Sequence, residues 1–175
     1  MNDISPQAQA RYEAELSILA GVLGQENYTT QLLGPQDDMP LPTLLVALGT
    51  DEESRERSLG ITIMPLGDNS LAATELVQFY SRMPFPVPAG RDTELRAATA
   101  AVNAAMALGH FAVLGEELFY RYVLAVPNNT TIDGAMLLEL VALLEFHQEH
   151  FADYLEGVID DEIALKTLPE LIALG

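Results

Sequence analysis

The chain has 175 residues, of which 26 are acidic and only 8 are basic, so its formal net charge is −18. A polyanion of this charge is repelled by nucleic-acid phosphates and by anionic membrane surfaces, so direct binding to either is not expected. Hydrophobic residues make up 49% of the chain and charged residues 19%, which is typical of a packed globular protein. The length favours a single domain spanning residues 1–175.

The absence of cysteine excludes disulfides, thiol nucleophiles and thiolate metal sites. The first ten residues have neither the basic start nor the apolar stretch of a signal peptide. No apolar run approaches the roughly 18 residues of a membrane span. We therefore expect a soluble, cytoplasmic protein.

The first part of the chain predicts a helix followed by four strands. Residues 7–23 have apolar side chains at helical spacing, with Pro6 at the start and Gly24 at the end, so residues 1–27 form an N-terminal helical region. The strand candidates are residues 28–33, 43–48, 58–66 and 74–85, and a tight turn is predicted at residues 67–70. The connections are short or charged, which favours an antiparallel meander.

The middle of the chain predicts a proline-rich connector, a helix and a hairpin. The connector at residues 84–88 leads to an alanine-rich helix that is capped by Asp92 or Thr93 and runs to Leu108. Its small side chains suit close packing against a sheet or against a second copy of the chain. Strands at residues 110–114 and 118–126 then form a hairpin with two apolar faces, so we expect both faces to be covered, one of them by a partner.

The last part of the chain predicts a long amphipathic helix. Asp133 caps this helix, which has about 27 residues and would be about 40 Å long. Part of so long a helix is expected to reach beyond the core of its own protomer. Residues 160–175 are predicted to be a weakly attached tail. The fold class is therefore α+β, in the order α-β-β-β-β-α-β-β-α: an antiparallel meander sheet with an N-terminal helix, an Ala-rich central helix and a long C-terminal helix.

The sequence contains no motif that points to catalysis. The patterns of a serine-nucleophile elbow, a phosphate-binding loop and a dinucleotide-binding loop are all absent, so we predict no catalytic residues, no cofactor and no enzymatic activity. His147 and His150 come nearest to a metal motif, with Asp153 one turn further on. Their spacing is not that of a zinc protease, so we expect no metal site, and a metal-dependent enzyme remains an alternative.

Several segments of the chain together resemble a known family. These are the run Gly115-Glu116-Glu117-Leu118-Phe119-Tyr120-Arg121-Tyr122-Val123-Leu124, the long helix containing Tyr154, and the segments 76–80 and 84–87. Over roughly residues 40–160 the chain resembles the YbjN family of bacterial proteins, whose fold is similar to that of type III secretion chaperones. The resemblance implies a homodimer without enzymatic activity, whose relatives bind segments of other proteins on apolar patches. It provides no catalytic residue.

We therefore predict a non-enzymatic protein-binding module, chaperone-like or regulatory, that captures a segment of a partner protein. The expected contact surface consists of Phe79, Phe119, Tyr120 and Tyr122. The acidic charge would steer a basic partner to residues 133–175, which contain ten acidic residues and one basic residue. Besides the metal-dependent enzyme, the alternative is an acidic DNA mimic that inhibits a nucleic-acid-binding protein.

Overall fold

The computed structural model describes residues 4–36, 39–65, 73–128 and 130–174. Its elements are α1 (Pro6–Gln25), β1 (Thr30–Leu33), β2 (Thr43–Thr50), β3 (Glu56–Met64), β4 (Thr74–Arg82), α2 (Asp92–Ala105), β5 (His110–Leu114), β6 (Glu117–Pro127), α3 (Gly134–Ile159) and α4 (Leu168–Leu174). The predicted α+β class and the predicted order of helices and strands are confirmed, with α4 as an additional short helix. The predicted turn at residues 67–70 lies outside the described residues.

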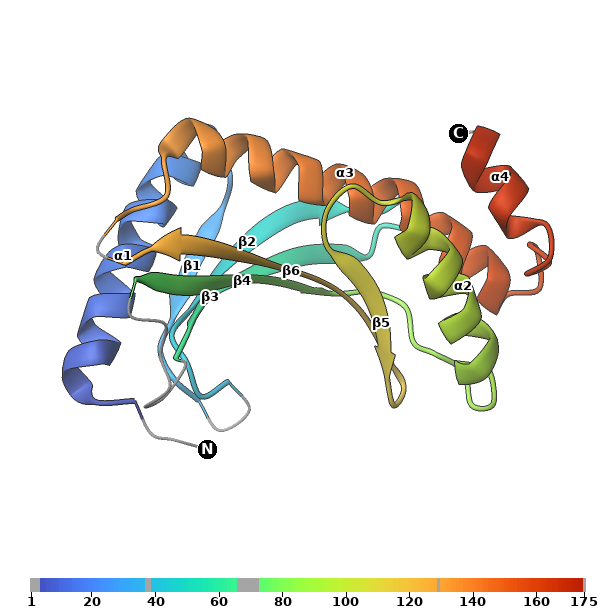
Figure 1. The fold of residues 1–175 in the computed structure, drawn as a ribbon, viewed down its shortest axis with the longest axis horizontal. Helices are drawn as coiled ribbons and strands as arrows, with labels where there is room; N and C mark the ends of the chain where they lie inside the picture. The colour runs from blue at the N-terminus through green and yellow to red at the C-terminus, as the bar shows by residue number, and fades with distance from the viewer. Residues whose placement is uncertain (1–3, 37–38, 66–72, 129, 175) are drawn as a thin grey trace.

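The six strands form one antiparallel sheet in the order β1-β2-β3-β4-β6-β5 (Figure 1). The first four strands follow one another as a meander, as the short connections predict. β6 then pairs with β4 and places β5 at the edge. In this register Phe79 lies opposite Tyr122, and Gln78 lies opposite Val123, so alternate residues of β4 and β6 share a face.

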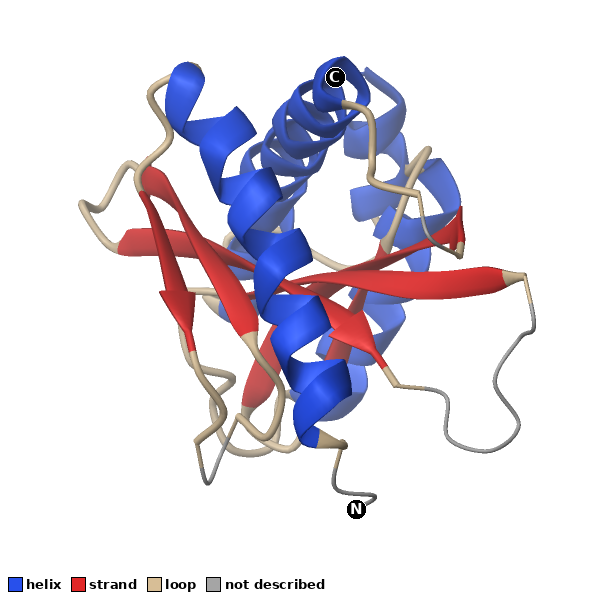
Figure 2. Ribbon diagram, turned by 90° about the vertical axis from the view of Figure 1, so that its left-hand side faces the viewer, coloured by secondary structure: helices blue, strands red, loops and turns tan. Residues whose placement is uncertain are grey.

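One face of the sheet carries the core. Most of the alternating residues that point to this face are buried, and they include Ile61, Phe79, Phe111 and Tyr120. The exceptions include the short β1 and the middle of β6, where Tyr122 and Leu124 are half-buried. Helices α1, α2 and α3 close over this face: α1 crosses one end of the sheet, and α3 runs over its length (Figures 1 and 2). The hydrophobic effect therefore favours a two-layer arrangement, with helices on one side of a curved sheet.

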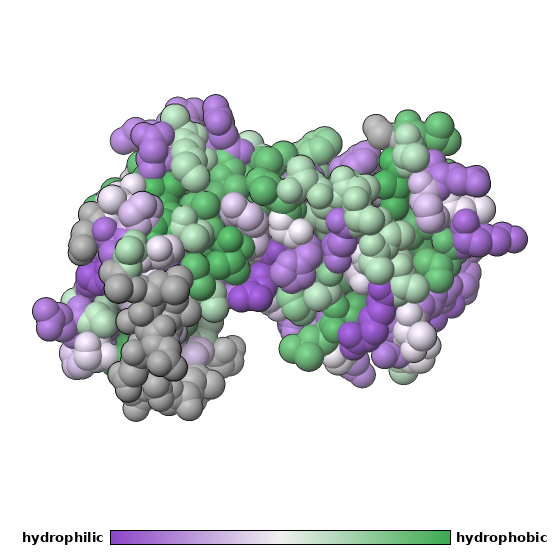
Figure 3. All heavy atoms as spheres, in the orientation of Figure 1, coloured by the Kyte–Doolittle hydropathy of each residue, from purple (hydrophilic) through white to green (hydrophobic). Residues whose placement is uncertain are grey.

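The opposite face of the sheet is more open. Its residues, which include Tyr80, Phe119, Arg121 and Val123, are half-buried, and no helix within the described part of the chain covers them. The molecule is hollowed on this side, beneath the arch of the sheet (Figure 3). Of the two apolar faces that the sequence predicts to be covered, the chain itself covers only one with helices.

Helix α3 begins where the sequence predicts and lies on the core throughout. The carboxylate of Asp133 accepts a hydrogen bond of 3.1 Å from the backbone N–H of Met136, which satisfies a free donor of the first turn. The buried residues of α3 extend from Leu137 to Ile159. The expectation that part of this helix reaches beyond the core of its own protomer was wrong, because the sheet and α2 support it along its full length.

Helix α2 differs from the prediction at both ends. Its N-cap is Arg91, which forms no side-chain capping bond, so the capping role expected for Asp92 or Thr93 was wrong. The helix ends at Ala105 rather than Leu108, because the Asn103 amide exchanges two hydrogen bonds of 2.8 and 2.9 Å with the backbone of Phe111 and draws the chain into β5.

The end of the chain packs on the outside of α2. Helix α4 contacts α2, and Leu168 at its start is completely buried. The Arg91 guanidinium donates hydrogen bonds to the carbonyls of Val158 and Ile159 at 2.6 and 2.9 Å. Both carbonyls belong to the last turn of α3, where the regular helical hydrogen bonds end, so Arg91 connects the start of α2 to the end of α3.

Candidate functional site

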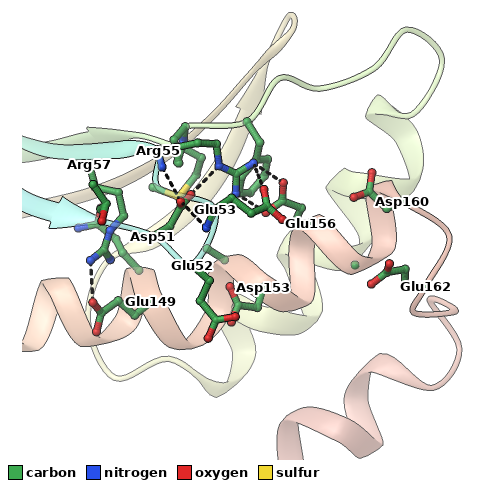
Figure 4. A pocket seen from close by; sticks show the side chains of 17 residues that line it. Asp51, Glu52, Glu53, Arg55, Arg57, Glu149, Asp153, Glu156, Asp160 and Glu162 are labelled. Atoms are coloured by element: carbon green, nitrogen blue, oxygen red, sulfur yellow. Dashed lines mark hydrogen bonds and ion pairs between the residues drawn. The ribbon is translucent and has the colours of Figure 1, made fainter.

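An acidic cleft lies between the β2–β3 connection and the C-terminal half of α3, with a volume of about 510 Å³ (Figure 4). Its acidic lining residues are Asp51, Glu52, Glu53, Glu149, Asp153, Glu156, Asp160 and Glu162. The lining also includes the basic residues Arg55 and Arg57 and the buried apolar side chains of Met83 and Phe85. Carboxylates thus outnumber the positive charges by a wide margin. We call this site the acidic cleft.

The β2–β3 connection is held by Asp51. One carboxylate oxygen of Asp51 accepts hydrogen bonds from the backbone N–H groups of Glu53 and Arg55, at 3.0 and 2.8 Å. Between these two residues Ser54 has a φ of 64°, in the left-handed region that non-glycine residues rarely adopt. The local hydrogen bonds stabilise this tight loop and place the side chains of Glu52 and Glu53 at the mouth of the cleft.

Arg55 joins the two walls of the acidic cleft. Its guanidinium forms a bidentate pair with Glu156 at 2.6 and 2.7 Å and donates to Asp51 at 2.6 Å. The guanidinium carbon also lies 5.3 Å from the centre of the Phe85 ring, within the range of a cation–π contact. The hydrogen bond to Glu156 raises the pKa of Arg55 above its ordinary value, so Arg55 stays charged. The cleft therefore already holds one guanidinium between carboxylates and an aromatic ring.

Two buried polar atoms in the wall of the cleft have no partner among the described residues. Gln148 is only 1% exposed and its amide nitrogen donates to the Leu144 carbonyl, but its Oε1 accepts nothing. Arg57 is 8% exposed and bonds Glu149 at 2.6 Å, whereas its Nε donates to nothing. A buried polar atom without a partner is unfavourable by about 1–3 kcal/mol.

Other carboxylates of the cleft form no ion pair within the described ranges: Glu52, Asp153, Asp160 and Glu162. Glu52 and Asp153 lie side by side (Figure 4). Partial burial, together with the negative charges of Glu52, Glu156 and Asp51, raises the pKa of Asp153. The carboxylates therefore repel one another, and a bound cation would relieve this repulsion.

The four residues predicted from the sequence do not form one contact surface. Phe79 and Tyr120 are completely buried beneath the helices, so their predicted role as contact residues was wrong. Tyr122 is half-buried on the same covered face, 6.0 Å from the Phe79 ring. Phe119 is half-buried on the opposite face, where it stacks on Tyr80 at 5.1 Å. The two faces of the sheet separate Phe119 from the other three.

The two histidines of the metal hypothesis point in different directions. His147 is buried, with its Nδ1 3.4 Å from the Tyr120 hydroxyl, and that hydroxyl donates to the Leu108 carbonyl at 2.8 Å. His150 lies on the solvent side of α3 and stacks on Phe146. Within the described part of the chain, no three His, Asp or Glu side chains are gathered so as to hold a metal ion.

Because His147 is buried, we expect the free energy of unfolding to depend on pH. Burial, with a smaller contribution from the charge of His150, lowers the pKa of His147 in the folded state. In the unfolded chain a histidine has a pKa of about 6.5, so just below this pH the unfolded chain binds more protons than the folded protein. The free energy of unfolding should therefore fall as the pH is lowered from 7.5 to 5.5. Urea unfolding at both pH values measures this loss.

Substitutions of the two histidines isolate the effect. The loss between the two pH values should be smaller in His147→Gln than in the wild type, whereas His150→Gln should keep most of it. The comparison with the wild type is needed because other groups oppose this effect. Folding raises the pKa values of Glu15, Glu145 and Asp153, so their protonation raises the free energy of unfolding as the pH falls. An equal loss in wild type and His147→Gln would contradict the assignment.

The sequence pointed to half of the acidic cleft. Five of its eight carboxylates come from residues 133–175, where the count of acidic residues is highest. The sequence does not predict the other half, at the β2–β3 connection, because the hydrogen bonds between Arg55 and Glu156 join residues that are 101 positions apart. The mixed run of charges at residues 51–57 was the only available signal, and it equally suits an exposed turn.

No helix within the described residues is long and apolar enough to span a membrane. Comparison with models of known protein families finds no match, and comparison with curated proteins finds no significantly similar sequence. The resemblance to the YbjN family therefore stays a prediction.

Proposed function

We propose that this protein is a non-enzymatic binding module that captures a basic segment of a partner protein in the acidic cleft. The observation that carries the proposal is a cleft of about 510 Å³ whose eight carboxylates outnumber its two arginines. The charge favours a cation, and the size suits one or two side chains of a peptide rather than a bare ion.

The carboxylates without an ion pair support a basic peptide as the ligand. Glu52 and Asp153 form no ion pair within the described ranges and can accept hydrogen bonds, and a lysine ammonium or arginine guanidinium carries only donors.

Arg55 supports the same chemistry from within the chain. The cleft holds its guanidinium between Asp51 and Glu156, with the Phe85 ring beneath. Bidentate carboxylate pairs and aromatic faces are the contacts that proteins use to bind arginine. An arginine from a partner would find carboxylates of the same kind at Glu52 and Asp153, which form no ion pair within the described ranges.

The broader expectations for the protein remain proposals of the same kind. They are membership of the YbjN family, chaperone-like or regulatory use of the captured segment, a homodimeric state and a place in the cytoplasm. The proposed capture does not depend on any of them, because the acidic cleft lies within one copy of the chain.

Removing two charges from the cleft should weaken the binding of a basic peptide. The probe is a short labelled peptide of alternating lysine and alanine, with a glutamine–alanine peptide as its uncharged counterpart. We expect Glu52→Gln/Asp153→Asn to raise the Kd for the lysine peptide about tenfold, because each of these exposed charges contributes up to about 1 kcal/mol. Fluorescence anisotropy at about 50 mM salt measures it.

A control variant with the same net charge separates the cleft from the general acidity. Glu116→Gln/Glu170→Gln changes two exposed carboxylates outside the cleft lining and should alter the Kd less than about twofold. If both variants weaken binding equally, the charge acts over the whole surface, as an acidic DNA mimic would require. That result, or no binding of the lysine peptide to the wild type, would overturn the proposal.

A further inference from the structure

The solvent side of α3 carries an exposed row of rings. Phe146 is 54% exposed, and every other phenylalanine or tyrosine that the structure describes is buried or half-buried. Its ring is nearly parallel to that of His150, at 5.5 Å and 8°, and His150 meets Tyr154 edge-on at 5.7 Å. The three residues are four positions apart, so they share one face of the helix. We call them the aromatic stripe.

Aliphatic side chains extend the aromatic stripe toward the start of α3. Leu143 is half-buried one turn before Phe146, and Met136, two turns earlier still, is 45% exposed. Hydrophobic side chains are visible along α3 in the upper half of the molecule (Figure 3). Glu139 lies on this side of the helix between Met136 and Leu143, so the stripe is unbroken from Leu143 to Tyr154, about 16 Å at 1.5 Å per residue. An apolar strip of this length is suited to contact with another element.

An acidic row runs beside the aromatic stripe on the same helix. Glu149 and Asp153 are four residues apart, and each immediately precedes a ring of the stripe. Both residues, with Glu156 one turn on, also line the acidic cleft. The stripe is therefore continuous with the proposed binding site: one flank of the solvent side of α3 is apolar and the other is negative.

The charges of α3 decide what can cover the stripe. The helix contains no lysine or arginine between Gly134 and Ile159. A second copy of α3 has no basic residue to place opposite the acidic row, and if it packed antiparallel on the stripe, acidic rows would meet acidic rows, which is unfavourable. A segment with an apolar row beside a basic row would match both flanks at once.

We propose that the partner segment is a basic amphipathic helix that lies along α3. Its apolar side chains cover the aromatic stripe, and its lysine or arginine side chains reach the carboxylates of the acidic cleft. A helix fits because rows spaced by four residues on α3 pack against rows with the same spacing on a second helix. This inference rests on the proposed function and adds the shape of the partner to its charge.

Two peptides of identical composition test the inference. One places its leucines in a single helical row beside its lysines, and the other has the same residues in scrambled order. The wild type should bind the ordered peptide about tenfold more tightly than the scrambled one. Phe146→Ala should reduce this preference to less than about threefold. Ile18→Ala removes a side chain of similar exposure, 52%, from α1 and should leave the preference unchanged.

The outcomes separate this inference from the proposed function. If both peptides bind equally and Glu52→Gln/Asp153→Asn still weakens their binding, the cleft binds basic segments but the stripe does not contribute. That result contradicts this inference and leaves the proposed function intact. If neither peptide binds, the result contradicts both this inference and the proposed function. If Phe146→Ala converts a dimer to a monomer in sedimentation without changing the preference, a second copy covers the stripe and the inference is overturned.

Discussion

Replacing Gly109 by alanine should lower the free energy of unfolding by about 3 kcal/mol. Gly109 has a φ of 71°, a conformation that side chains with a Cβ adopt only with strain. An added Cβ would also lie only 2.6 Å from the Cζ of Tyr120, and closer still to its hydroxyl oxygen. The expected result combines a backbone penalty with the displacement of a large buried ring.

Tyr120 has little freedom to move away from such a Cβ. Its ring is completely buried, packs 5.1 Å from that of Phe111, and its hydroxyl is bonded to the carbonyl of Leu108. Displacing it would break this buried hydrogen bond and disturb the contact of α3 with β6 through His147. Core sites packed this closely tolerate added volume poorly.

A second glycine isolates the steric part of the loss. Gly115 also has a positive φ, 62°, but nothing lies within 4 Å of a Cβ built there. Gly115→Ala should therefore be less stable than the wild type by only about 1 kcal/mol, the backbone term alone. Urea unfolding of both variants gives the comparison. Similar losses for Gly109→Ala and Gly115→Ala would show that Tyr120 does not constrain Gly109.

The second large effect concerns the end of the chain. Leu168→Ala should lower the free energy of unfolding by about 2–4 kcal/mol, the range for deleting a fully buried leucine. Leu168 is 0% exposed in the contact between α4 and α2, although the sequence predicts a weakly attached tail there. If α4 unfolds together with the rest of the domain, the cavity left by this substitution destabilises the whole molecule.

Leu174 provides a control within the same helix. It is 86% exposed, so Leu174→Ala makes the same chemical change without opening a cavity, and it should alter stability by less than about 0.5 kcal/mol. If Leu168→Ala proves as stable as Leu174→Ala, helix α4 separates from α2 before the domain unfolds. The tail would then be weakly attached, as the sequence predicts.

Local signals explain why most of the fold could be predicted from the sequence. Asp133 followed by apolar residues at helical spacing predicted the start of α3, and the alternation in residues 118–126 predicted β6. Both signals depend on chemistry within a few residues. The length of α3 was also predicted closely, but its position was not, because the supporting contacts come from β6 and α2.

The candidate site was harder to predict because it depends on which surfaces meet. A period of two residues divides β6 into two faces but does not say which face the helices will cover. The sequence therefore predicts Tyr120 as a contact residue, whereas the structure buries it. The acidic cleft needs Arg55 to reach Glu156 from across the molecule. Phe146 gave no signal, because a phenylalanine in an apolar stretch of α3 suits the core equally well.

The position of β6 in the sheet also bears on how the chain folds during synthesis. β1 to β4 are synthesised in the order in which they pair. The second edge of β4 cannot pair until β6 has been synthesised, because α2 and β5 come between β4 and β6 in the chain. Until residue 127 has been made, β4 presents an unpaired edge, and such edges favour pairing with other chains. A polypeptide released before β6 is complete would therefore expose one of the longest strands of its sheet to its neighbours.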